Sequence, residues 1–277
     1  MKWSDIKSFR TMHKLVLLVL CGAAYALAAP GARIVGGQGA SIEEYPFSAV
    51  LMYYWEDVWQ PNCGGALVTR TTILSAATCY GFALPSTFSA RVGSTSRVTG
   101  GTVVAAREFV FHPDYLKVME ALQPMPFDLV IVRVAPGIEY STVIQPARIP
   151  AAQFPLPTGT ALTALGWGQT TNNGSLIGII TEASETLKQV EVRVFDQQTC
   201  RERYSAYEIV DHMLCSIAVE GAGTCRGDTG GPVVLDGDVV VGISSWRRNN
   251  LCGNDFYPEI STKVSTFSGW IVENGSG

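Results

Sequence analysis

The sequence predicts an all-β protein, and three observations support this prediction. Short runs rich in Val, Ile and Thr recur between turns that contain Gly, Pro or Asn, as in proteins built from short strands. The chain contains 28 glycines and only 16% charged residues, below the usual quarter. About 244 residues follow Arg33, which is enough for one large domain or two small barrels.

The N-terminal segment has the features of a secretory signal. Residues 15–29 form an apolar run behind Lys14, and Ala26-Leu27-Ala28 supplies small residues for a cleavage site. The run is shorter than a typical membrane-spanning helix. A buried core helix is the alternative, but the position at the start of the chain argues against it. We therefore expect residues 1–28 to be removed and the protein to be secreted.

The charge of the remaining chain limits the possible partners. Removing residues 1–33 takes away five of the 20 basic residues and one of the 24 acidic residues, which leaves a formal charge of −8. Such a balance argues against nucleic acid or an anionic membrane as a partner.

The cysteine count predicts disulfides. Cys21 leaves with the signal, and six cysteines remain in a secreted chain. Fifteen pairings are possible in principle. None of these cysteines has metal-site spacing with histidines nearby, so we expect no metal and no cofactor.

One glycine-rich stretch, Ala222 to Pro232, is the most specific motif of the chain. Its core, Gly-Asp-Thr-Gly-Gly-Pro at residues 227–232, resembles the nucleophile loop of the trypsin/chymotrypsin family, where Gly-Asp-Ser-Gly-Gly-Pro carries the catalytic serine. Thr229 stands at the serine position. The resemblance implies that the backbone N–H groups of Gly227 and Thr229 point at a developing oxyanion.

Two further motifs match the family's other catalytic landmarks. The family reads Ala-Ala-His-Cys where this chain has Ala-Ala-Thr-Cys, so Thr78 replaces the general base. A threonine hydroxyl cannot accept a proton near neutral pH and cannot activate a nucleophile. Asp128 occupies the position of the third catalytic residue. Without the histidine it is an orphan carboxylate, which we expect to accept hydrogen bonds from backbone or from Thr78 if it is buried.

Two histidines remain in the mature chain, and neither is expected to replace the base. His112 lies in Phe-His-Pro-Asp-Tyr, which is typical of a surface turn, and His212 precedes Met213 at a position expected to be exposed. We expect both to be solvated or turn histidines, because either would need a large rearrangement to reach Thr229.

The resemblance also implies an activation switch and a disulfide pattern. Arg33-Ile34-Val35-Gly36-Gly37 is similar to the family's zymogen junction, with residues 29–33 as a short activation peptide. Cleavage after Arg33 would free the Ile34 ammonium to pair with Asp228; alternatively, Ile34 simply begins the first strand. The family's disulfides correspond here to Cys63–Cys79, Cys200–Cys215 and Cys225–Cys252.

The specificity pocket departs from the family pattern. Gly223 occupies the pocket floor, where trypsins have aspartate. The sequence therefore does not support a preference for substrates with Lys or Arg in this pocket. Two wall positions that are usually glycine carry Arg247 and Glu259. We expect these long side chains to obstruct the pocket, paired across it. The alternative is that both point to solvent.

The resemblance implies that residues 34–277 form one protease-like domain of two antiparallel, six-stranded Greek-key barrels. We expect the barrels over about 34–148 and 149–262, a proline-rich crossing at 148–159, and a terminal helix over about 263–273. Within them we predict strands over Ser48–Tyr54 and Gly65–Ser75, and a short helix through Tyr204 capped by Asp196.

The altered positions predict a secreted serine protease homologue without peptidase activity, similar to insect gut trypsins. Its expected role is binding, decoy or regulation, with a protein or peptide ligand such as a protease inhibitor or another protease. Only residues 29–33 separate the predicted signal cut from Ile34, so we expect no clip domain and favour the gut lumen. The alternative is a weakly active serine-type digestive endopeptidase that uses Thr229.

Overall fold

The computed structural model describes residues 37–118, 124–170, 183–218, 222–248 and 251–275. The predicted signal segment and the activation junction at Arg33 and Ile34 lie outside these ranges. No helix within them is both long enough and apolar enough to cross a membrane.

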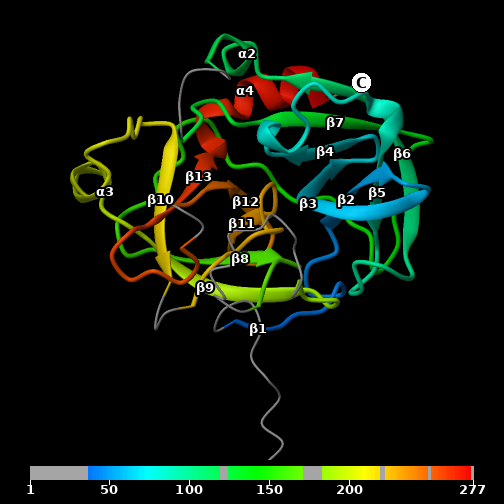
Figure 1. The fold of residues 1–277 in the computed structure, drawn as a ribbon, viewed down its shortest axis with the longest axis horizontal. Coiled ribbons are helices and arrows are strands. Elements are labelled where there is room, and N and C mark those ends of the chain that lie inside the picture. Colours follow the sequence, from blue (N-terminus) through cyan, green and yellow to red (C-terminus); the bar gives the residue numbers. More distant parts are fainter. Residues whose placement is uncertain (1–36, 119–123, 171–182, 219–221, 249–250, 276–277) are drawn as a thin grey trace, which may run out of the picture. The chain divides into compact units, whose positions relative to one another are not determined.

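The first half of the described chain forms a closed antiparallel barrel of six strands (Figure 1). Its strands pair in the order β2-β3-β4-β7-β6-β5. They span Ser48–Trp55 (β2), Val58–Thr69 (β3), Thr72–Ser75 (β4), Phe88–Val92 (β5), Thr102–Phe111 (β6) and Val130–Ala135 (β7). Two short 3-10 helices, Ala77–Cys79 (η2) and Pro85–Thr87 (η3), lie between β4 and β5.

The second half repeats this arrangement. Strands β9-β10-β13-β12-β11-β8 follow one another in the sheet, and pairing between β8 and β9 closes them into a second six-stranded barrel. They span Ala161–Gly166 (β8), Lys188–Val194 (β9), Met213–Ala218 (β10), Pro232–Leu235 (β11), Val239–Trp246 (β12) and Glu259–Lys263 (β13). The two-residue strand β1, Gln38–Gly39, adds to the outer edge of β9. The predicted fold of two six-stranded barrels is therefore confirmed.

Strand β9 shows why the sequence folds this way. Val190, Val192 and Val194 are buried, whereas Glu191 and Arg193 between them are exposed. Successive side chains of a strand point to opposite faces, so this alternation places one face of β9 in the barrel core.

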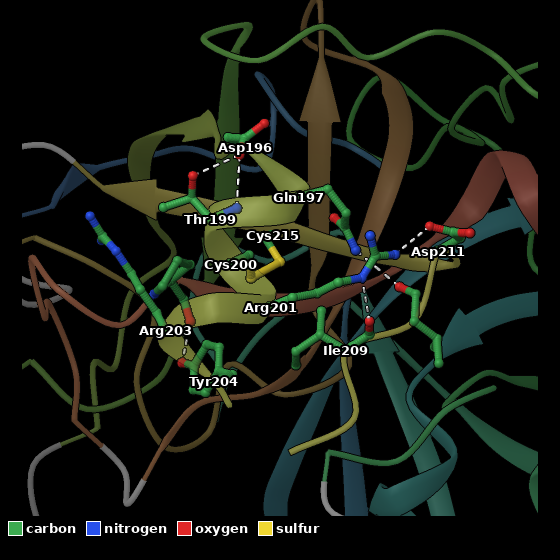
Figure 2. The surroundings of a disulfide bond; sticks show 12 residues. Asp196, Gln197, Thr199, Cys200, Arg201, Arg203, Tyr204, Ile209, Asp211 and Cys215 are labelled. Atoms are coloured by element: carbon green, nitrogen blue, oxygen red, sulfur yellow. Dashed lines mark hydrogen bonds and ion pairs between the residues drawn. A yellow bond between two sulfur atoms is a disulfide. The ribbon is translucent and has the colours of Figure 1, made fainter. Parts of the chain in front are cut away.

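Within the described residues, three α-helices accompany the barrels: Tyr115–Val118 (α2), Gln197–Arg203 (α3) and Val264–Gly275 (α4). As predicted, Asp196 caps α3, accepting a hydrogen bond from the Thr199 N–H at 2.8 Å (Figure 2). The same view shows the Cys200–Cys215 disulfide, which fastens α3 to β10. The predicted C-terminal helix is also present, with Phe267 and Ile271 buried.

Two other disulfides, Cys63–Cys79 and Cys225–Cys252, complete the set expected from the resemblance. Cys63–Cys79 joins β3 to η2, and Cys225–Cys252 joins the glycine-rich loop to the segment before β13. Both bonds therefore brace the segments that carry the candidate site.

One predicted strand has different bounds. The run Gly65–Ser75 is interrupted by a turn at Arg70 and Thr71, which separates the end of β3 from β4. Strand β3 also begins earlier, at Val58, because residues 58–61 pair with the outer end of β2.

Candidate active site

The carboxylate of Asp128 accepts hydrogen bonds from two residues of the site. The side chain is fully buried and accepts three hydrogen bonds. The Thr78 N–H donates to Oδ1 at 2.8 Å, the Thr78 hydroxyl donates to Oδ2 at 3.1 Å, and the Ser245 hydroxyl donates to Oδ2 at 2.5 Å. Burial raises the pKa of Asp128, and the bonds from Ser245 and Thr78 act in the opposite direction.

Thr78 and Asp128 are brought together by the first barrel. Thr78 lies on η2, directly after β4, and Asp128 comes two residues before β7, the strand that pairs with β4. Ser245 reaches the same carboxylate from β12 of the second barrel. The sequence did not single out Ser245, because no local pattern indicates this contact across the two barrels.

Thr229 lies on the glycine-rich loop, partly buried, and its carbonyl accepts a hydrogen bond from the Gly64 N–H at 2.8 Å. Among the described residues, none forms a hydrogen bond with its side-chain hydroxyl. The backbone N–H groups of Gly227 and Thr229 likewise donate to no described residue. The φ of Gly227 is 93°, a conformation that favours glycine. Within the described chain, both N–H groups are therefore without an acceptor.

Asp228 fixes the shape of this loop from within the protein. Its buried carboxylate accepts hydrogen bonds from the N–H groups of Gly168, at 2.7 Å, and Cys225, at 2.8 Å. Burial raises the pKa of Asp228, and these two bonds oppose the shift. The expected partner, the Ile34 ammonium, lies outside the described residues.

Glu259 lies against the floor of the expected specificity pocket. Its Oε1 would be only 2.5 Å from a Cβ placed on Gly223, so no larger residue fits at position 223 without displacing the carboxylate. Oε2 accepts a hydrogen bond from the Thr224 hydroxyl at 2.9 Å, whereas Oε1 is buried with no hydrogen-bond partner among the described residues. Burial raises the pKa of Glu259 to about 7, although the positive charge of Arg247 counteracts this.

Arg247 also points inward, since only 8% of its surface is exposed. Burial lowers its pKa, and the negative charges of Glu259 and Asp228 act in the opposite direction. The described residues include no direct ion pair between Arg247 and Glu259, and the Nε of Arg247 is buried without a partner there. Neither residue points freely to solvent, and the two interact through their charges without forming the expected pair.

Of the two expected environments, solvated or turn, the structure places His112 and His212 in turns and not in open solvent. Both are partly buried and stack on the ring of Phe127, with centroid distances of 5.3 and 4.3 Å. The edge of Phe267 packs against both histidines. Phe127 adopts a φ of 60°, which is unusual for a bulky residue. Neither imidazole forms a hydrogen bond with Thr229 or Asp128 within the described chain.

Comparisons with known proteins agree with this architecture. The trypsin family model matches residues 34–271. Trypsin CFT-1 of Choristoneura fumiferana is 35% identical over 94% of this chain and 98% of its own length. Alkaline trypsin B of Manduca sexta is 33% identical over 95% of this chain and all of its own length.

A solved structure shows the same fold. Neuropsin, a serine protease expressed in the limbic system of mouse brain, superposes with a TM-score of 0.72 at 26% identity, covering 87% of this chain and 99% of the other. The family model, the insect relatives and the paired barrels together establish that this chain belongs to the trypsin family.

Proposed function

We propose that this protein is a secreted member of the trypsin family that lacks peptidase activity and acts as a binding, decoy or regulatory protein. One observation carries the proposal: Thr78 stands where the family has its general base, and directs both its N–H and its hydroxyl at Asp128. That carboxylate has no imidazole to orient, and no described group is placed to take a proton from Thr229.

The expected loss of rate is large. Removing the base or the nucleophile of a triad lowers turnover by about 10⁶. A typical turnover of ~10 s⁻¹ would fall to roughly 10⁻⁵ s⁻¹, which is too slow for digestion. Threonine at position 229 adds a methyl group that is stiff at χ1 and crowds the attack.

The pocket supports the same conclusion. Glu259 and Arg247 replace glycines at the wall, and both send charged groups inward instead of into solvent. Oε1 of Glu259 lies 2.5 Å from the position of a Cβ on Gly223, so we expect the carboxylate to hinder a substrate side chain that enters beside Gly223. The expected ligand is therefore a protein or peptide that uses the surface around the cleft.

The activation switch belongs to this proposal. Cleavage after Arg33 would release the Ile34 ammonium to approach Asp228, whose carboxylate already holds two N–H groups of the loop. A buried charge pair of this kind typically costs about 3–5 kcal/mol to break by removing one partner. Cleavage would thus stabilise the loop without supplying a base.

A second candidate is a weakly active endopeptidase that uses Thr229. The N–H groups of Gly227 and Thr229, which have no acceptor among the described residues, favour it, because oxyanion binding alone leaves a residual acceleration of about 10³–10⁴ over water. The insect relatives are named trypsins, which also keeps this candidate open.

The experiment is to cleave the purified protein after Arg33 and to measure turnover on broad peptide mixtures and labelling by a serine-reactive phosphonate. We expect no labelling and no turnover above that of the Thr229→Ala variant. Turnover that the Thr229→Ala substitution abolishes would establish the peptidase instead.

The decoy role has its own test. The cleaved protein is immobilised and exposed to a panel of purified protein inhibitors of serine proteases, with an active trypsin as the positive control. Retention of an inhibitor whose reactive-site residue is small would support a decoy that does not use the deep pocket. Absence of all binding would leave the decoy role without support and favour a different ligand.

A further inference from the structure

A long hairpin beside the candidate site carries an unusual surface. Strands β2 and β3 are joined by Glu56 and Asp57, whose φ values of 48° and 63° are both positive, as a two-residue hairpin turn requires. Strand β2 pairs with β5 only as far as Tyr53, and β4 pairs with β3 only from Ala66 onward. The outer part of the hairpin, residues 54–61, therefore projects from the barrel.

Large apolar side chains on this projection face solvent. The exposed fraction is 58% for Trp55, 56% for Val58, 45% for Tyr54 and 40% for Trp59. The rings of Tyr54 and Trp59 pack together at 5.2 Å. Trp and Tyr clustered on an exposed surface are typical of sites that bind other proteins.

The strand register places these side chains on two faces of the hairpin. Tyr54 lies opposite Trp59, and Trp55 lies opposite Val58. Successive side chains of a strand point to opposite faces, so the packed rings of Tyr54 and Trp59 share one face. We call this pair, together with the two turn residues, the hairpin patch: Tyr54, Glu56, Asp57 and Trp59.

The charge of the patch is negative. Glu56 and Asp57 are the only charged residues in residues 53–62. The Tyr54 hydroxyl donates a hydrogen bond to Oδ1 of Asp57 at 3.1 Å, which holds one carboxylate beside the rings. Aromatic faces attract cations as well, so the carboxylates and the rings both favour a positively charged ligand group.

We propose that the hairpin patch binds a protein segment that presents Arg or Lys beside apolar side chains. The cation lies between the turn carboxylates and the rings of Tyr54 and Trp59, and the apolar neighbours pack on the same two rings. Strand β3 continues from the patch to Gly64, whose N–H binds the Thr229 carbonyl. A partner on the patch thus lies beside the cleft without entering the pocket.

This inference rests on the proposed binding role, but the two are tested separately. The probes are a synthetic 14-residue peptide in which Arg alternates with Leu, a matched peptide with Glu in place of Arg, and linear β-linked oligosaccharides. Binding is measured by tryptophan fluorescence and by calorimetry on the full chain after cleavage at Arg33. The assay does not depend on turnover, so a peptidase that binds the Arg peptide would defeat only the proposed function.

Two variants identify the patch. Tyr54→Ala with Trp59→Ala removes both rings of the patch, and we expect the Arg peptide to bind at least about 30-fold more weakly. Glu56→Asn with Asp57→Gly removes both carboxylates while supplying the residues that such a turn prefers, so the hairpin remains folded. We expect it to weaken binding about fivefold and to reduce the salt dependence. Tyr140→Ala, an exposed tyrosine outside the patch, is the matched control.

Equal binding of the Glu peptide would overturn the proposal, as would equal binding of the Arg peptide to all variants, or no binding. Binding of an oligosaccharide in preference to the Arg peptide would assign the patch to a carbohydrate and overturn it as well.

Discussion

The hydroxyl of Thr78 donates a hydrogen bond to Oδ2 of Asp128 at 3.1 Å, while the Thr78 N–H binds Oδ1 of the same carboxylate. Thr78 stands where the family has its histidine base. It donates both hydrogen bonds to Asp128, the carboxylate that would otherwise orient that histidine. The carboxylate is fully buried, and buried charges without partners are costly. Thr78 therefore has a structural role in addition to being unable to accept a proton.

The first prediction follows from this contact. Thr78→Val keeps the shape of the side chain but removes the hydroxyl, so we expect the free energy of unfolding to fall by about 1–2 kcal/mol. Thr78→Ser, which retains the hydroxyl, is the matched control and should change stability little. Urea denaturation midpoints at constant slope measure the difference. Equal stability of the valine and serine variants would show that the bond does not contribute.

A second prediction concerns Glu259 and pH. Its pKa rises from 4.5 in the unfolded chain to about 7 in the folded protein. Between these values the folded state binds more protons, so stability falls as pH rises from about 4.5 to about 7, by of order 2 kcal/mol. Glu259→Gln should remove this component, as measured by urea midpoints at pH 5 and pH 8. An unchanged pH dependence in Glu259→Gln would contradict the buried placement of the carboxylate.

The two barrels and the disulfide pairs could be predicted because the motifs of the chain resemble those of the trypsin/chymotrypsin family. The helix after Asp196 could be predicted because a capping aspartate marks its first turn. The extent of the β2–β3 hairpin was harder to predict, because Pro61 lacks an N–H for a central strand and is tolerated here where β4 does not pair. The predicted strand therefore begins too late, at Gly65 instead of Val58.

The site was predicted in part, and what was missed depends on contacts between distant segments. Asp128 was expected to bond to Thr78, but the contribution of Ser245 comes from the other barrel. Arg247 and Glu259 were expected as a pair, whereas the buried Arg247 and the buried Oε1 of Glu259 interact through their charges without an ion pair in the described chain. Side-chain direction at such positions is set by packing, which a single sequence does not encode locally.

The histidine cluster gives a third prediction, opposite in sign to that of Glu259. Burial lowers the pKa of His112 and of His212, and each also lies near the other and near Asp114. Asp211 raises the pKa of His212, and Lys117 lowers that of His112. Because each folded pKa lies below the unfolded value of 6.5, the unfolded state binds more protons near pH 6. This contribution to stability is lost as pH falls through that range.

The variant that tests this is His212→Gln, which keeps polarity but does not titrate. We expect the variant to lose less stability between pH 7 and pH 5 than the parent protein, as measured by urea midpoints. Both proteins carry Glu259→Gln, which removes the opposite pH dependence of Glu259. A steeper acid loss in the variant would refute the assignment.

The last prediction restores the chemistry in two stages. Thr78→His with Thr229→Ser rebuilds the triad beside Asp128 and Gly227, so we expect slow hydrolysis of small ester substrates. Adding Arg247→Gly and Glu259→Gly together opens the wall and removes both buried charges at once, which avoids leaving one uncompensated. With Gly223 on the floor, peptide substrates with uncharged side chains should then gain at least about tenfold in kcat/KM over the first variant. The measurement is kcat/KM for both variants on the same substrate series. If the two variants hydrolyse the series equally well, Glu259 and Arg247 do not obstruct the pocket, and the absent base together with Thr229 accounts for the whole loss of activity.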